Sequence, residues 1–219
     1  MENTTTIAVS YFDQKHALAI RIWHWVTFGL FAASIVMVLL AKTLFVTKGN
    51  IAMVQDQIKE KGGMVTAEQA RNVAHEYNDK LWNTHKLIGY FLCFALLSRV
   101  VIEVAVSKEE KMINRLRQAK LVAAKKVRHS TSDAGHYAMV KYLYLIFYGL
   151  FIVMAVTGLM LAFEDVEFLK PIHRSVKSLH EFIQYCIYGY IVIHLVGVIR
   201  ADVTVNPGIV SRMINSGKA

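Results

Sequence analysis

The sequence predicts an all-α integral membrane protein, a four-helix bundle with both termini in the cytoplasm. Three observations support this fold class. Hydrophobic residues make up 55 % of the 219 residues, above the roughly 45–50 % of an average soluble domain. Only two residues are prolines. Four apolar stretches approach the roughly 20 residues that a helix needs to cross a bilayer. We therefore expect a single transmembrane domain over residues 1–219.

The four predicted spans are apolar stretches of membrane-crossing length. The third contains no charged residue, and the fourth contains none between Phe182 and Ile199. Because an even number of spans returns the chain to the side on which it began, both termini should lie on the same side. The predicted spans are residues 20–41, 85–106, 142–163 and 180–200.

The loop from Ser107 to Met139 predicts the orientation. Its acidic residues are only Glu109, Glu110 and Asp133. Its basic residues are Lys108, Lys111, Arg115, Arg117, Lys120, Lys125, Lys126 and Arg128. Since loops rich in lysine and arginine stay on the cytoplasmic side, this loop and both termini are expected there.

The outer loop between the first and second spans predicts a short amphipathic helix. The run Thr66-Ala67-Glu68-Gln69 is typical of a capping box. Apolar residues follow at helical spacing, at Ala70, Val73, Ala74, Tyr77 and Leu81. We expect this helix to lie on the outer membrane surface, after a hinge at Gly62-Gly63.

Charge and cysteine content argue against two classes of protein. The net charge of +9 is not accompanied by a zinc-finger or RNP-like motif, so we expect membrane lipid, and no nucleic acid, as a partner. Cys93 and Cys186 both lie inside apolar runs. They therefore suggest neither a disulfide framework nor a CxxC metal site.

Four of the nine histidines lie within the predicted spans, namely His24, His85, His180 and His194. His194 comes fourteen residues after His180. In a helix this spacing moves a side chain ~21 Å along the axis and returns it to within ~40° of the same face. Ionisable side chains inside a bilayer are costly and usually face the bundle interior, where they have a partner.

The predicted topology supplies such partners by depth. The first span begins inside and the fourth ends inside, so His24 and His194 should lie at one level. The second span begins outside, which places His85 level with His180. Opposed neutral imidazoles on neighbouring helices suit the two axial positions of a haem iron. From the residues alone, interhelical hydrogen bonding, proton relay and metal transport remain alternatives to haem binding.

Metal transport has less support than haem binding, because a transporter would more often add acidic or cysteine ligands at the same depth. Glu103 is the only acidic residue deep in a span. A haem-free transporter or channel and a purely structural anchor subunit nevertheless stay open as functions of another class.

An ordered set of motifs resembles a known family, the diheme cytochromes b of the prokaryotic cytochrome b561 and Ni,Fe-hydrogenase b-type subunit group. The resemblance covers roughly residues 21–200. Its residues are Arg21-Ile22-Trp23-His24-Trp25, His85 with Gly89 and Arg99, Val156-Thr157-Gly158-Leu159, and His180-Glu181 with Gly189-Tyr190 and His194. The resemblance implies two b-type haems, one held by His24 and His194 and the other by His85 and His180.

Two arginines are candidate partners for haem propionates. Arg99 follows His85 by fourteen residues, hence lies ~21 Å deeper, near the level of the haem expected between His24 and His194. Arg21 lies three residues before His24. We expect both to neutralise propionates by charge-assisted hydrogen bonds; snorkelling to lipid headgroups is the alternative.

The resemblance implies transmembrane electron transfer between the quinone pool and a redox partner, such as a periplasmic dehydrogenase, a hydrogenase or a c-type cytochrome. Within the family, a free-standing quinone-linked oxidoreductase acting on a small oxidant such as superoxide is the alternative. The chain has no nucleotide-binding GxGxxG run after a strand and no cysteine cluster, and no catalytic residue is predicted. We expect a multi-pass protein of a bacterial inner membrane.

Overall fold

The computed structural model describes residues 17–105, 111, 114, 117, 131–205 and 208–215. These residues form helices and no strand, which confirms the all-α class. Four helical stretches are long and apolar enough to cross a membrane, at Leu18–Lys42, Ala67–Ala105, Tyr142–Ala162 and Glu167–Thr204. The basic loop predicted to be cytoplasmic lies mostly outside the described residues, so the side on which it lies stays a prediction, as does that of the termini.

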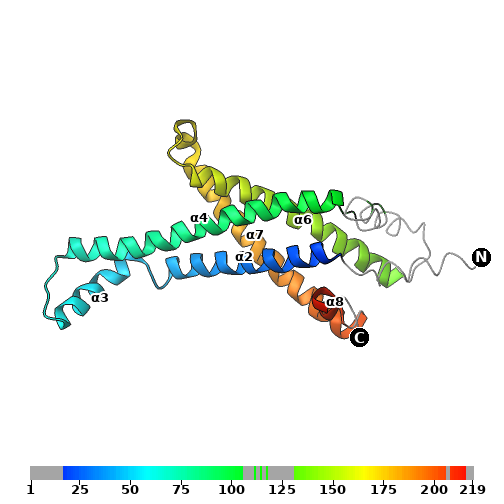
Figure 1. Ribbon diagram of the computed structural model, residues 1–219, viewed down its shortest axis with the longest axis horizontal. Helices are drawn as coiled ribbons and strands as arrows, with labels where there is room; N and C mark the ends of the chain where they lie inside the picture. The colour runs from blue at the N-terminus through cyan, green and yellow to red at the C-terminus, as the bar shows by residue number, and fades with distance from the viewer. Residues whose placement is uncertain are drawn as a thin grey trace, which may run out of the picture. The chain divides into compact units, whose positions relative to one another are not determined.

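The chain divides into two compact units. Residues 26–94 form one unit, and residues 1–25 together with 95–219 form the other. Helices α2 (Leu18–Lys42) and α4 (Ala67–Ala105) each run without a break and contribute residues to both units (Figure 1). The single domain over residues 1–219 stays a prediction.

Within the unit of residues 26–94, Asn78 of α4 hydrogen-bonds to the chain at the C-terminal end of α2. The last carbonyls of a helix lack partners within it, and the Asn78 amide donates to the carbonyls of Ala41 at 2.9 Å and Phe45 at 2.8 Å. Trp82 Nε1 in turn donates to Asn78 Oδ1 at 2.9 Å. One side chain of α4 thus caps the C-terminus of α2.

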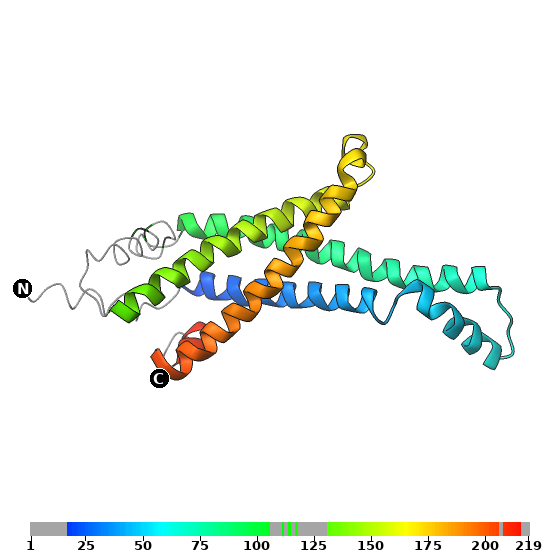
Figure 2. The same ribbon diagram turned by 180° about the vertical axis from the view of Figure 1, so that it is seen from behind.

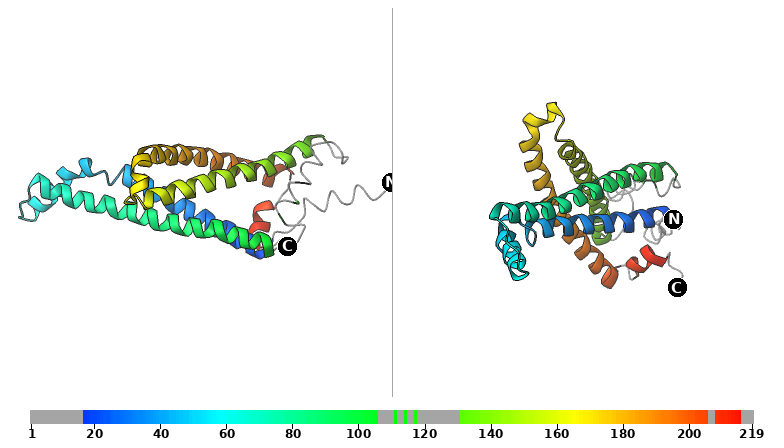
Figure 3. Two further views of the ribbon diagram at one scale, coloured as in Figure 1. Left: turned by 90° about the horizontal axis from the view of Figure 1, so that it is seen from above. Right: turned by 60° about the vertical axis from the view of Figure 1, so that its left-hand side comes forward.

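Helix α3 (Thr47–Glu60) is an element that the sequence analysis did not predict. It lies at an angle to α2 and does not continue it (Figure 3). The turn after α3 contains the predicted hinge, Gly62-Gly63. Gly62 has φ +80°, a conformation that glycine adopts without strain, and Gly63 N–H donates to the Ile58 carbonyl at 3.0 Å.

The predicted capping box is confirmed, but the helix that it starts is not a separate one. Thr66 N–H donates to Gln69 Oε1 at 2.9 Å, and Gln69 N–H donates to Thr66 Oγ1 at 3.2 Å. The helix then runs for 39 residues, straight through the predicted start of the second span near His85. No proline or helix-ending glycine stands between the two segments, so the backbone hydrogen bonds continue.

The other unit is built on a hairpin of α6 (Thr131–Ala162) and α7 (His173–Arg200), which pack against each other (Figure 2). The 3₁₀ turn η1 (Glu167–Ile172) joins them and buries Leu169. Phe151 is 1 % exposed, and Ile183 and Ile187 are also buried. Apolar side chains of the two facing helices therefore form the core of the hairpin.

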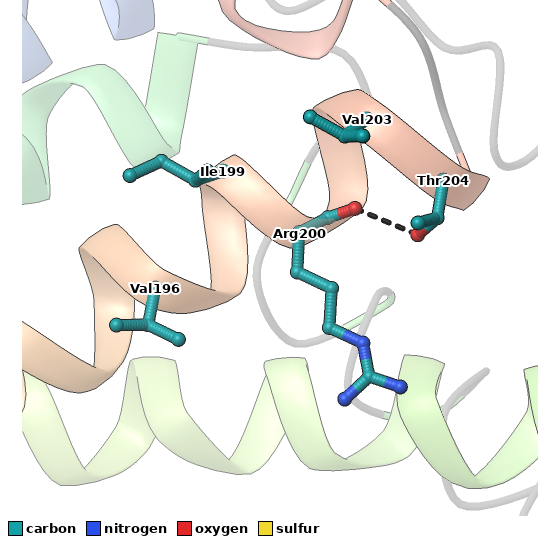
Figure 4. A pocket seen from close by; sticks show the side chains of 5 residues that line it. All are labelled: Val196, Ile199, Arg200, Val203 and Thr204. Carbon is teal, nitrogen blue, oxygen red and sulfur yellow. Dashed lines mark hydrogen bonds between the residues drawn. The ribbon is translucent and has the colours of Figure 1, made fainter.

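After α7 the chain makes one π-helical turn, η2 (Ala201–Val205), in which Thr204 Oγ1 donates to the Arg200 carbonyl at 2.7 Å (Figure 4). A shallow apolar hollow lies along this end of the helix. The short helix α8 (Ile209–Asn215) follows. Its last carbonyls are bound by residues of α2, since Arg21 Nη1 donates to Ile214 O at 3.1 Å and Trp25 Nε1 donates to Met213 O at 3.2 Å.

Candidate functional site

The rings of His24 on α2 and His194 on α7 are neighbours in one unit, in an edge-to-face arrangement. Their ring centroids are 6.2 Å apart and their planes are inclined by 61°. Metal–imidazole nitrogen bonds are about 2.0–2.1 Å long, so two imidazoles on opposite sides of one metal ion have centroids roughly 6 Å apart. His24 and His194 could therefore hold a haem iron between them, since neutral imidazoles are suitable donors to it.

Aromatic rings surround this histidine pair. Tyr190 stacks on His194, with centroids 6.0 Å apart and planes inclined by 6°, and Phe147 stacks on Tyr190 at 5.0 Å. Trp25 packs edge-on against His24 at 5.5 Å. These contacts restrict the rotation of both imidazole rings. Helical spacing explains the contact of Tyr190 with His194, because the two residues lie one turn apart on α7.

Arg21 lies one helical turn before His24 and is only 9 % exposed. Its Nη1 donates to the Ile214 carbonyl. Its Nε is buried and has no hydrogen-bond partner among the described residues. Buried donors are normally satisfied, so this nitrogen fits a carboxylate that would bind beside His24, as a haem propionate would.

Arg99 is already engaged by protein groups. Its Nη1 lies 2.8 Å from Glu103 Oε2, and its Nε donates to the Tyr148 hydroxyl at 3.0 Å. The guanidinium also lies over the Trp23 ring, 5.9 Å from its centroid. The predicted contact of Arg99 with a propionate stays a prediction. The Arg–Glu spacing of four residues is a signal in the sequence for the ion pair.

His180 is held by a residue of α6. Its Nδ1 lies 2.9 Å from Thr157 Oγ1. A Cβ placed on the neighbouring Gly158 would lie 3.3 Å from His180 Cε1. The ring therefore packs directly against the backbone of α6 at the Thr157-Gly158 pair, which the sequence analysis noted as a motif but gave no role.

His85 has a comparable hydroxyl partner within the unit of residues 26–94. Ser34 Oγ of α2 lies 3.1 Å from His85 Nδ1. Trp82 packs edge-on against the His85 ring at 5.8 Å. His85 and His180 belong to different units, and their pairing stays a prediction from depth and resemblance.

In the described part of the chain, no cysteine or carboxylate joins the histidines to form a larger metal-binding cluster. Cys93 and Cys186 are both free thiols. Over residues 17–105 and 131–205, as in the other described positions, no three His, Cys, Asp or Glu side chains gather to hold a metal ion. The donor set that the structure brings together is one pair of imidazoles, His24 and His194, and such a pair could hold a haem iron.

Comparison with known proteins identifies the family. A family model for prokaryotic cytochrome b561 matches residues 15–216. No curated protein and no solved structure gives a significant match. The matched range includes all four span histidines and the four helices of membrane-crossing length. The chain therefore belongs to the prokaryotic cytochrome b561 family.

Proposed function

We propose that this protein is a diheme cytochrome b that carries electrons between the quinone pool and a redox partner across a bacterial inner membrane. Membership of the prokaryotic cytochrome b561 family indicates a membrane protein that binds b-type haem and transfers electrons. The observation that carries the proposal is the His24–His194 pair, whose ring centroids are 6.2 Å apart in a chain with four helices able to span a bilayer.

Each residue of the site has a role in this proposal. His24 and His194 would hold one haem, and His85 and His180 would hold the other. A bound b-type haem supplies a one-electron carrier whose potential the protein sets. Tyr190 and Trp25 orient the imidazoles and exclude water. Arg21 would neutralise a propionate, and Arg99 remains a second candidate for that task.

Quinone chemistry would couple this electron transfer to the membrane potential. Reducing or oxidising a quinone takes up or releases protons on one side of the membrane. Each charge moved across it corresponds to about 2.3 kcal/mol per 100 mV. The proposed partner is a periplasmic dehydrogenase, a hydrogenase subunit or a c-type cytochrome, since the motifs of the chain supply no flavin or iron–sulfur centre of their own.

The test is a haem count on the detergent-purified full chain. We expect a sharp b-type α-band in the dithionite-reduced minus oxidised spectrum and two haems per chain by pyridine haemochrome. His24→Ala and His194→Ala should each lower the count to one. His75→Ala is the matched control, because His75 is exposed and pairs with Asp79 on the surface of α4. A featureless spectrum from folded wild-type protein would contradict the proposal and favour a haem-free transporter.

A further inference from the structure

We infer that Thr157 is a positioning residue for His180, whose ring it holds with the proton on Nδ1 and the lone pair of Nε2 directed to a metal. The inference deepens the proposed function and rests on it. Thr157 lies on α6, which carries none of the four histidines, and its hydroxyl would set the potential of one haem through His180.

The hydrogen bonds of Thr157 determine which atom carries the proton. A threonine hydroxyl has a single proton to donate. Thr157 Oγ1 lies 2.7 Å from the Val153 carbonyl and 3.1 Å from the Met154 carbonyl. Carbonyls only accept, so the hydroxyl proton is used there. The 2.9 Å contact with His180 Nδ1 is then one in which the ring N–H donates and the hydroxyl oxygen accepts.

This assignment makes Nε2 the coordinating atom. A neutral imidazole carries one N–H and one lone pair, so a proton on Nδ1 leaves the lone pair on Nε2. Histidines that bind metals usually donate their other ring N–H to a nearby acceptor, which fixes the tautomer and the ring orientation. Thr157 provides such an acceptor, and at 4 % exposure it is shielded from competing water.

Gly158 adds a steric constraint to the same ring. A Cβ at this position would lie 3.3 Å from His180 Cε1, a tighter approach than most side-chain contacts. The imidazole is thus held by its nitrogen through Thr157 and along its edge by the α6 backbone. Both residues of the Thr157-Gly158 pair therefore act on His180.

The four histidines differ in their surroundings. The hydroxyls of Thr157 and Ser34 contact Nδ1 of His180 and His85. The contacts described for His24 and His194 are with aromatic rings. A hydrogen bond from Nδ1–H raises the basicity of an imidazole ligand, and a more basic ligand favours oxidised iron. The haem bound by His180 should therefore have a lower potential than it would without the hydroxyl.

The test replaces Thr157 by valine, which has the same shape and lacks the hydroxyl. In the purified full chain we expect the midpoint potential of one haem to rise and its low-spin electron paramagnetic resonance signal to shift, while the other haem is unchanged. Retention of the affected haem should weaken by about 10–100-fold. Thr157→Ser keeps the hydroxyl and should restore the wild-type values.

Two further variants keep the test decisive. Thr43→Val is the matched control, because Thr43 also donates to the carbonyl four residues before it, at 2.6 Å, and its hydroxyl contacts none of the histidines whose side chains the structure describes. If Thr157→Val does not accumulate, Gly158→Ala should shift the same haem signal by pressing on the ring. Wild-type signals in either variant would overturn the inference. Wild-type protein without haem would instead overturn the proposed function.

Discussion

Arg99 and Glu103 form an ion pair one turn apart on α4, with 2.8 Å between Nη1 and Oε2. Their side chains are 12 % and 26 % exposed, within a helix able to span a bilayer. Charged side chains are costly at this depth. Their pairing, together with the Tyr148 hydroxyl and the Trp23 ring, explains how α4 tolerates both charges.

Neutralising the acid of this pair should destabilise the protein. Glu103→Gln leaves the Arg99 charge without its counterion, and we expect a loss of about 1–3 kcal/mol, below the 3–5 kcal/mol of a fully buried pair because Glu103 is partly exposed. Thermal unfolding in detergent measures it. Glu76→Gln is the control, since the exposed Glu76–Lys80 pair at 3.9 Å should contribute little. Equal stability of both variants would contradict the role of the ion pair.

The two arginines should differ in their effect on the haem that we propose for His24 and His194. Removing a cation near a haem favours the oxidised form and lowers its potential. The buried Nε of Arg21 has no hydrogen-bond partner among the described residues, whereas the charge of Arg99 is balanced by Glu103. We therefore expect Arg21→Leu to lower the potential more than Arg99→Leu. A redox titration measures both, with exposed Arg71→Leu as control. Unchanged potentials in both variants would refute the propionate contacts.

The spans were predictable because membrane-crossing length and charge depletion are properties of local sequence. The four helices followed from this signal, and the reciprocal capping of Thr66 and Gln69 followed from the capping-box pattern of residues 66–69. The extent of α4 did not. Its polar first turns suggested a separate surface helix, yet nothing between Leu81 and His85 interrupts the backbone hydrogen bonds. Hydropathy marks where a helix enters lipid and not where it begins.

The sequence predicted the ionisable residues of the site, but not the neutral side chains that contact them. The predicted topology placed His24 and His194 at the same depth in the membrane, and in the structure their rings are neighbours. Thr157 and Ser34 were missed as histidine partners because hydroxyls in membrane helices are common and most satisfy their own helix backbone. Helix α3 was missed because its polar sequence has no span signal. Such contacts depend on which helices become neighbours, which single-helix periodicity does not specify.

The Asn78 amide should stabilise the end of α2. Asn78→Ala removes its hydrogen bonds to the Ala41 and Phe45 carbonyls, each contributing about 0.5–1.5 kcal/mol. We expect faster amide hydrogen exchange from residues 40 to 46 and a loss of about 1–3 kcal/mol in unfolding free energy. Asn72→Ala, at an exposed position of the same helix, should change neither. Exchange rates unchanged in Asn78→Ala would show that the end of α2 does not depend on this amide.

The ring of Tyr190, and not its hydroxyl, should support His194. Tyr190 stacks on His194 with planes inclined by 6° and on Phe147 at 5.0 Å, and an aromatic pair contributes about 0.5–1.5 kcal/mol beyond its buried area. Tyr190→Phe keeps both stacks and should retain the wild-type haem count and spectrum. Tyr190→Leu frees the imidazole to rotate, so the haem that we propose for His24 and His194 should be released at lower denaturant concentration. The absorbance of each variant during a urea titration measures this release. If Tyr190→Phe lost haem as readily as Tyr190→Leu, the hydroxyl would be the supporting group, and the stacked rings would only fill space beside His194.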